Sequence, residues 1–322
     1  MTGRERVIKA IEFDNPDRIP ICFWNRDHKR GDIMVFELSI PPLSDVFAAP
    51  EAKIRSEWGY EWTKLNDGTM GQPEKPVIKD WIDLDSYSFP QLNPTGRTNG
   101  VEAFKKQAGS RYLLASLCIS GFTTYMFIRG FQNAMLDFID EAEQSVELLD
   151  AIFSFENALI ALTAEVGFDG IHFADDWGTQ DELIISPVLW RRIFKPRYAS
   201  QFDYAHSLGL HVWFHCCGNI TSIVPDFYDT GVDVMNISQP NVVDVPKVAT
   251  ILKGKQCFMV PISYQTVSIS GTPEDIKAEA RRLYTELGTE NGGFIGYVED
   301  YGCMGMSEEN FNACVTGFRE LM

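Results

Sequence analysis

The sequence predicts an α/β protein in which a single domain, residues 1–322, forms a (β/α)₈ barrel with an irregular N-terminal region. From about residue 100 onward, apolar strand-like runs alternate with helical stretches, a pattern typical of a parallel sheet. The length of 322 residues suits one large barrel or two smaller domains. A doubly wound open sheet is the alternative, but no Gly-x-Gly-x-x-Gly fingerprint follows a strand.

The N-terminal region begins with an amphipathic helix over residues 2–13, which ends at Asn15-Pro16-Asp17. A first strand follows at 19–24. Residues 25–100 are rich in Pro, Gly, Asp and Trp and mostly lack periodicity, although Tyr60–Leu65 alternates like one arm of a hairpin. Because the alternating part supplies too few strands for a complete barrel, we expect an eighth strand within this irregular stretch.

The alternating part contains six further strands and a helix after nearly every one. The strands are predicted at 111–117, 170–175, 211–216, 233–238, 256–262 and 293–298. The helices are predicted at 131–165 (with a break), 187–207, 221–229, 244–253, 272–287 and 307–320. Two helix starts carry a capping residue followed by proline, Ser186-Pro187 and Thr272-Pro273.

Composition excludes several classes of function. The formal net charge is −17 and no long basic run occurs, which disfavours nucleic-acid binding and docking on an anionic membrane. No apolar run has the length of a membrane span, and the polar start does not resemble a signal peptide. The seven cysteines do not suggest a secreted disulfide framework. We therefore expect a cytoplasmic protein that acts on a small molecule.

The sharpest group of candidate residues follows the strand 211–216. Residues two apart in a strand point to the same side, so His215 and Cys217 can converge on one ion while Cys216 points away. Imidazole and thiolate together favour zinc. Cys303 lies beyond the last strand on the same rim and is the candidate third ligand. The simpler interpretation is that these cysteines are small core or loop residues.

A second group follows the strand 170–175. Asp175 and Asp176 are paired carboxylates that can bind a metal, share a proton or anchor a basic group, although a capping turn explains them equally well. Trp177 is a candidate pocket wall. His172 lies inside the strand and is expected to be a buried, hydrogen-bonded residue.

Other strand ends supply weaker candidates. Arg26 and Arg30 could hold carboxylates or phosphates, but a solvated loop is the favoured interpretation. Gly121 permits a close backbone approach, and Tyr125 lines either a cavity or the core of the next helix. Glu299 is a candidate for proton transfer or for orienting a metal ligand. The remaining candidate pocket residue is Gln239.

Several motifs together resemble the uroporphyrinogen decarboxylase superfamily, which includes cobalamin-dependent methyltransferases. The motifs are Thr2–Val7 with Pro16–Pro20, Asp175–Gln180, Ile185–Pro187 with Trp190, Phe194–Tyr198, His215-x-Cys217-Gly218 and Gly231–Asn236. The resemblance runs nearly from end to end. It implies a (β/α)₈ barrel whose active cleft lies at the carboxyl ends of the strands.

Within that superfamily, the His-x-Cys motif with a distant cysteine resembles methylcobalamin:coenzyme M methyltransferases. This resemblance implies that His215, Cys217 and Cys303 hold zinc, and that zinc activates a thiol to accept a methyl group from a corrinoid. The segment between Cys303 and the final helix is shorter than this branch leads us to expect. The same resemblance implies a corrinoid, either methylcobalamin or a corrinoid protein, as co-substrate or partner.

Two alternatives remain open. The decarboxylase branch carries an Arg-Gln-Ala-Gly-Arg segment whose arginines hold porphyrin carboxylates; here Arg26 and Arg30 keep the spacing, but Asp27-His28-Lys29 lies between them. The two acids Asp175 and Asp176 and the His-x-Cys motif are not expected in that branch. A barrel that binds a corrinoid or another small molecule without turnover is the other alternative.

Overall fold

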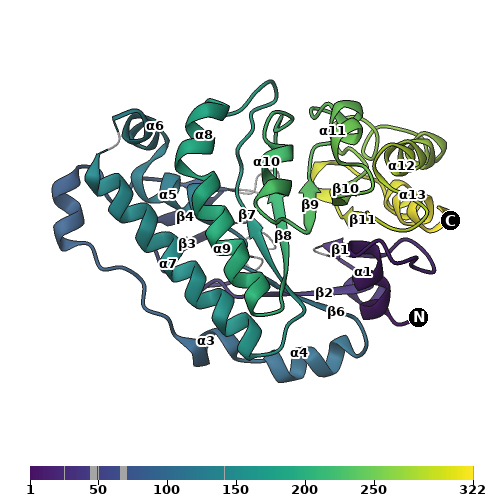
Figure 1. The fold of residues 1–322 in the computed structure, drawn as a ribbon, viewed down its shortest axis with the longest axis horizontal. Helices are drawn as coiled ribbons and strands as arrows, with labels where there is room; N and C mark the ends of the chain where they lie inside the picture. Colours follow the sequence, from purple (N-terminus) through teal and green to yellow (C-terminus); the bar gives the residue numbers. More distant parts are fainter. Residues whose placement is uncertain (25, 44–48, 50, 66–70, 141, 322) are drawn as a thin grey trace.

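The computed structural model describes residues 1–24, 26–43, 49, 51–65, 71–140 and 142–321. Its main sheet has eight strands, all paired in parallel, in the order β1-β11-β10-β9-β8-β7-β6-β2 (Figure 1). The two end strands, β1 and β2, lie next to each other, and Asp32 N donates to Ile21 O at 2.9 Å. The sheet is therefore a nearly closed barrel, as the alternating sequence predicts.

The predicted strands and helices are confirmed with small shifts at their ends. The barrel strands are β1 (Ile21–Trp24), β2 (Ile33–Glu37), β6 (Tyr112–Ser116), β7 (Gly170–Ala174), β8 (His211–Cys216), β9 (Val234–Ile237), β10 (Cys257–Pro261) and β11 (Phe294–Glu299). The helices are α1 (Gly3–Ile11), α3 (Pro94–Thr98), α4 (Val101–Ala108), α5 (Gly121–Arg129), α6 (Phe131–Asp140), α7 (Glu143–Glu165), α8 (Pro187–Ile193), α9 (Lys195–Ser207), α10 (Val224–Asp229), α11 (Val245–Leu252), α12 (Pro273–Leu287) and α13 (Glu308–Arg319).

The N-terminal region differs most from a regular βα repeat. The eighth strand is β2, and only residues 25–32, with the short 3₁₀ helix η1 (His28–Arg30), connect it to β1. An insert between β2 and β6 contains a small antiparallel sheet of β3 (Ala52–Arg55), β4 (Glu61–Lys64) and β5 (Gln72–Pro73), followed by the 3₁₀ helix η2 (Trp81–Ser86). The predicted hairpin arm is therefore β4.

Alternation along the strands divides the core into two layers. In β8, Trp213 belongs to the cluster that fills the barrel, whereas Val212 and Phe214 pack outward against the surrounding helices. Helix α1 closes the amino-terminal end of the barrel, because Val7 and Ile11 join the interior cluster. The opposite end, where the strands finish, is the mouth of the barrel. Loops at that end carry the functional groups in proteins of this architecture.

The helices surround the strands on the outside (Figure 1). Both predicted capping residues act as expected: the Ser186 side chain accepts from Leu189 N, and the Thr272 side chain accepts from Asp275 N. None of the helices that the structure describes is long and apolar enough to cross a membrane.

Candidate functional site

Three side chains converge at the mouth of the barrel, where β7 and β8 end. Ala174 pairs with His215 in the register of these strands, so Asp176 comes to lie beside Cys217. Cys217 N donates to Asp176 Oδ1 at 2.9 Å. His215 Nε2 lies 3.5 Å from Cys217 Sγ and 3.7 Å from Asp176 Oδ1. Within the part of the chain that the structure describes, these three residues form the group with metal-ligand spacing.

A neighbouring strand fixes the orientation of His215. Asn236 lies opposite His215 in the register of β8 and β9. The Asn236 amide nitrogen donates to Met259 O at 2.8 Å, so its Oδ1 is the acceptor that faces His215 Nδ1 at 2.6 Å. Nδ1 therefore donates to Asn236, and Nε2 is the ring nitrogen that faces Cys217 and Asp176. Metal-binding histidines commonly have an oxygen acceptor on their second ring nitrogen in this way.

The loop that carries Cys217 is held closely against the loop after β7. Gly218 has φ +79°, and a Cβ atom there would lie 2.1 Å from Gly178 O, so this contact requires glycine. Gln239 braces the same loop: its Oε1 accepts from Gly218 N at 2.7 Å, and its Nε2 donates to Tyr264 at 2.9 Å. Gln239, predicted to line the pocket, is thus buried behind Cys217 and supports it.

Burial and the nearby Asp176 carboxylate raise the pKa of the Cys217 thiol well above its usual range. A nearby cation would favour the thiolate instead. The group also offers the imidazole, thiolate and carboxylate donors that zinc takes in proteins. The donor chemistry therefore fits a zinc ion, and Asp176 belongs to the set alongside the predicted ligands His215 and Cys217.

Glu299, at the end of β11, is the second acidic group of the mouth. Its Oε2 accepts hydrogen bonds from Tyr297 and Tyr301, both at 2.9 Å. Burial raises the pKa of Glu299, while the two tyrosine hydroxyls and His215 act in the opposite direction. Tyr264 stacks on Tyr301 with ring centroids 4.7 Å apart. A carboxylate held by tyrosines therefore faces the same mouth as the metal-ligand group.

Asp175 points away from the mouth, although it precedes Asp176 directly. It is completely buried and accepts from Phe122 N at 2.9 Å, from Thr123 N and Oγ1 at 2.6 Å each, and from the Tyr198 hydroxyl. Burial raises the pKa of Asp175 to about 7, although the hydrogen bonds to the carboxylate act in the opposite direction. Asp175 therefore anchors the first turn of α5 and does not reach a substrate at the mouth.

Trp177 and Tyr125 also differ from their predicted place in a pocket wall, since both have 0% exposure. Trp177 stacks on Phe122 with ring centroids 4.1 Å apart. The Tyr125 hydroxyl donates to Asp137 Oδ2 at 2.8 Å. Both residues belong to the core cluster between barrel and helices, Trp177 in the loop after β7 and Tyr125 within α5. Cys216 lies in this layer as predicted, and His172 is buried with its Nδ1 3.1 Å from Ser116 Oγ.

The remaining predicted residues lie on the rim. Cys303 is exposed in the 3₁₀ helix η3 (Gly302–Met304) and is not among the three converging residues. Arg26 pairs with Asp300 at 3.0 Å and with Glu308 at 2.9 Å. Arg30 pairs with Asp27 at 2.8 Å. Each arginine is thus already engaged by acids of the chain itself.

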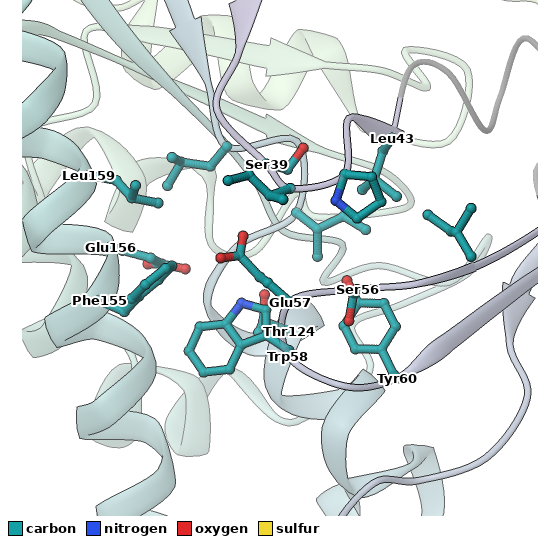
Figure 2. A pocket seen from close by; sticks show the side chains of 15 residues that line it. Ser39, Leu43, Ser56, Glu57, Trp58, Tyr60, Thr124, Phe155, Glu156 and Leu159 are labelled. Carbon is teal, nitrogen blue, oxygen red and sulfur yellow. The ribbon is translucent and has the colours of Figure 1, made fainter. Parts of the chain in front are cut away.

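A separate cavity of about 40 Å³ lies between the insert and α7 (Figure 2). Phe155 and Glu156 reach it from α7, and Glu57 and Trp58 reach it from the insert (Figure 2). Such a volume holds a few water molecules at most. None of the mouth residues lines this cavity, so it is separate from the candidate site.

The sequence model of uroporphyrinogen decarboxylase (URO-D) matches residues 65–320 of this chain. The chain belongs to the uroporphyrinogen decarboxylase family. The matched segment of this family contains the whole Asp176, His215 and Cys217 group. Arg26 and Arg30 precede it.

One curated relative in the family is a uroporphyrinogen decarboxylase of Chlorobium phaeovibrioides. It is 22% identical over 241 residues, which cover 70% of this chain and 66% of that protein, slightly less than two thirds of its length. Among solved structures, a methyltransferase from Methanosarcina mazei has a TM-score of 0.74 at 15% identity, with 99% of each chain covered. At that identity, the likeness establishes a shared fold.

The sequence interpretation missed the residues that support the mouth of this family member. Asn236 was visible as a polar residue in an otherwise apolar strand, next to the strand of His215. Tyr297 and Tyr301 flank Glu299 at spacings of two, but nothing in the sequence shows that both hydroxyls reach one carboxylate oxygen. These supporting contacts depend on strand register and loop direction.

Proposed function

We propose that the protein is a zinc-dependent methyltransferase that moves a methyl group between a corrinoid, methylcobalamin or a corrinoid protein, and a thiol or another small acceptor or donor. The observation that carries this proposal is the convergence of His215 and Cys217 at the mouth, with Asn236 fixing the ring nitrogen that would bind the metal. A catalytic zinc site needs such protein ligands and one position open to substrate.

The roles of the residues follow from their contacts. His215 and Cys217 would hold the ion, while Gln239 keeps the loop of Cys217 in place. Zinc, when bound, would lower the pKa of a thiol substrate so that its thiolate forms near neutral pH. Glu299 is the candidate acceptor for the released proton, because only its Oε2 is engaged by the tyrosines among the contacts that the structure gives.

Metal analysis of the wild type and of Cys217→Ser tests this proposal. We expect about one zinc per chain in protein purified without chelator or affinity metal, and loss of both zinc and methyl transfer from methylcobalamin to thiols in the variant. Cys314→Ala, which changes a buried cysteine of α13, is the matched control and should retain its zinc. No zinc in the wild type, even after zinc is added back, would end the methyltransferase proposal.

A second candidate function is the decarboxylation of uroporphyrinogen, because a curated relative bears that name. The spacing of Arg26 and Arg30 favours it, whereas their ion pairs with Asp300, Glu308 and Asp27 and the metal-ligand group favour methyl transfer. Direct assay of porphyrinogen decarboxylation distinguishes the two functions. A barrel that binds its ligand without turnover would show binding of a corrinoid and neither activity.

A further inference from the structure

Resting on the proposed function, we infer that Asp176, and not Cys303, supplies the third protein ligand of the metal. The site then contains one imidazole, one carboxylate and a single thiolate, and keeps one position for substrate. This ligand set departs from the His215, Cys217 and Cys303 set that the family resemblance implies.

The two distances from His215 to the other ligand atoms match a tetrahedral zinc site. With zinc bonds of about 2.0–2.1 Å to nitrogen, 2.3 Å to sulfur and 2.0–2.2 Å to oxygen, tetrahedral angles place nitrogen about 3.6 Å from sulfur and about 3.4 Å from oxygen. The structure has His215 Nε2 at 3.5 Å from Cys217 Sγ and at 3.7 Å from Asp176 Oδ1. The third pair, an Asp176 carboxylate oxygen and Cys217 Sγ, lies within 4.8 Å, so one ion can contact all three atoms once the side chains adjust.

Contacts around the carboxylate keep it in this position. Cys217 N donates to Asp176 Oδ1, and Asp176 N donates to Thr123 Oγ1 at 3.1 Å. The Asp176 side chain is 50% exposed, so a metal ion arriving from solvent can reach its carboxylate. The β7–β8 register fixes the separation between Asp176 and the other two ligands, because Ala174 pairs with His215.

Cys303 has the opposite environment. It is an exposed residue of η3, two residues beyond Tyr301, whose hydroxyl donates to Glu299. Gly302 N donates to Asp300 Oδ1 at 2.8 Å, and Gly305 N donates to Gly302 O, which closes the turn on itself. Among the residues that the structure describes, Cys303 is not within metal-ligand spacing of His215 and Cys217, whereas Asp176 is.

Cobalt substitution distinguishes the two ligand sets. In the full chain with Co²⁺ replacing zinc, the intensity of the thiolate-to-cobalt charge-transfer band grows with the number of bound thiolates. We expect Cys303→Ser to retain both the band and the metal content, and Cys217→Ser to lose the band. A band reduced by half in Cys303→Ser would overturn the inference and leave the proposed function standing.

Asp176→Asn is the complementary variant, because asparagine keeps an oxygen that can accept from Cys217 N but removes the negative charge. We expect the dissociation constant for zinc or cobalt to rise about tenfold or more, with the charge-transfer band still present at saturating cobalt. Asp181→Asn, an exposed acid of the same loop, is the matched control. Unchanged affinity in Asp176→Asn would also overturn the inference, and failure of the wild type to bind either metal would end the proposed function as well.

Discussion

Asp175 and Asp176 are adjacent in the sequence but belong to two different regions of the molecule. Asp175 lies in the buried layer between barrel and helices, where four donors surround its carboxylate. Asp176 lies at the mouth, half exposed, beside His215 and Cys217. Alternation of side-chain direction at the strand end separates them. Residue type alone therefore does not identify a functional carboxylate, whereas its direction relative to the barrel does.

The comparison predicts the largest change in stability for substitution of Asp175. Asp175→Ala removes the acceptor of four buried hydrogen bonds, so the free energy of unfolding should fall by about 3–5 kcal/mol. Asp176→Asn should change it by less than about 1 kcal/mol. Urea denaturation of both variants provides the measurement. Equal losses of stability would contradict the division between the two regions.

For zinc binding the order of the two variants should be reversed, so that Asp176→Asn has the larger effect and Asp175→Ala the smaller. The folded fraction of Asp175→Ala should retain its metal, because Asp175 contacts none of the three converging residues through its carboxylate. Loss of metal from folded Asp175→Ala would show that the buried layer holds the mouth in shape.

The buried layer also predicts a dependence of stability on pH. Burial raises the pKa of Glu156 to about 8, although Gly121 N and Gln201 donate to its carboxylate at 2.7 and 2.9 Å. Between about pH 5 and pH 8 the folded chain keeps a proton that the unfolded chain has lost. The free energy of unfolding should therefore fall as pH rises, by up to about 1.4 kcal/mol per pH unit for this one proton.

Glu156→Gln isolates this contribution. The variant should show a shallower fall in stability between pH 5 and pH 8 when urea denaturation is repeated across that range. Glu165→Gln, at the exposed end of the same helix, should behave as the wild type does. A wild-type slope in Glu156→Gln would mean that Glu156 is ionised in the folded protein.

Much of the fold follows from the sequence, because regular strands and helices leave a periodic signal. The predicted strand 211–216 has the bounds that the structure shows. Its alternation also predicts correctly that the Cys216 side chain points away from His215. Strand β2 was expected only as an unplaced eighth strand. Its run Ile33–Glu37 is short, and among the described residues only the 3₁₀ helix η1, with no α-helix, lies between β1 and β2, so the signal of a βα repeat is missing there.

The candidate site was predictable only where its residues share one strand. His215 and Cys217 are two apart, and that spacing alone indicates that they face the same side. Asp176 joins them through the register of two neighbouring strands. The position of Cys303 depends on the direction of a loop after β11. Sequence spacing contains no information about loop direction, so it does not show that Asp176 lies closer than Cys303 to His215 and Cys217.

Substitutions of the arginines at the rim of the barrel should have the smallest effect on zinc content and activity. Arg26 bridges Asp300 and Glu308, and its guanidinium lies 4.4 Å from the centre of the Phe311 ring. Exposed ion pairs of this kind contribute little to stability, so Arg26→Ala should leave zinc content and methyl transfer nearly unchanged. Arg30→Ala, which breaks the pair with Asp27, is the parallel variant. Complete loss of activity in Arg26→Ala with normal zinc content would instead show that this arginine recognises a substrate carboxylate, as the decarboxylase alternative requires.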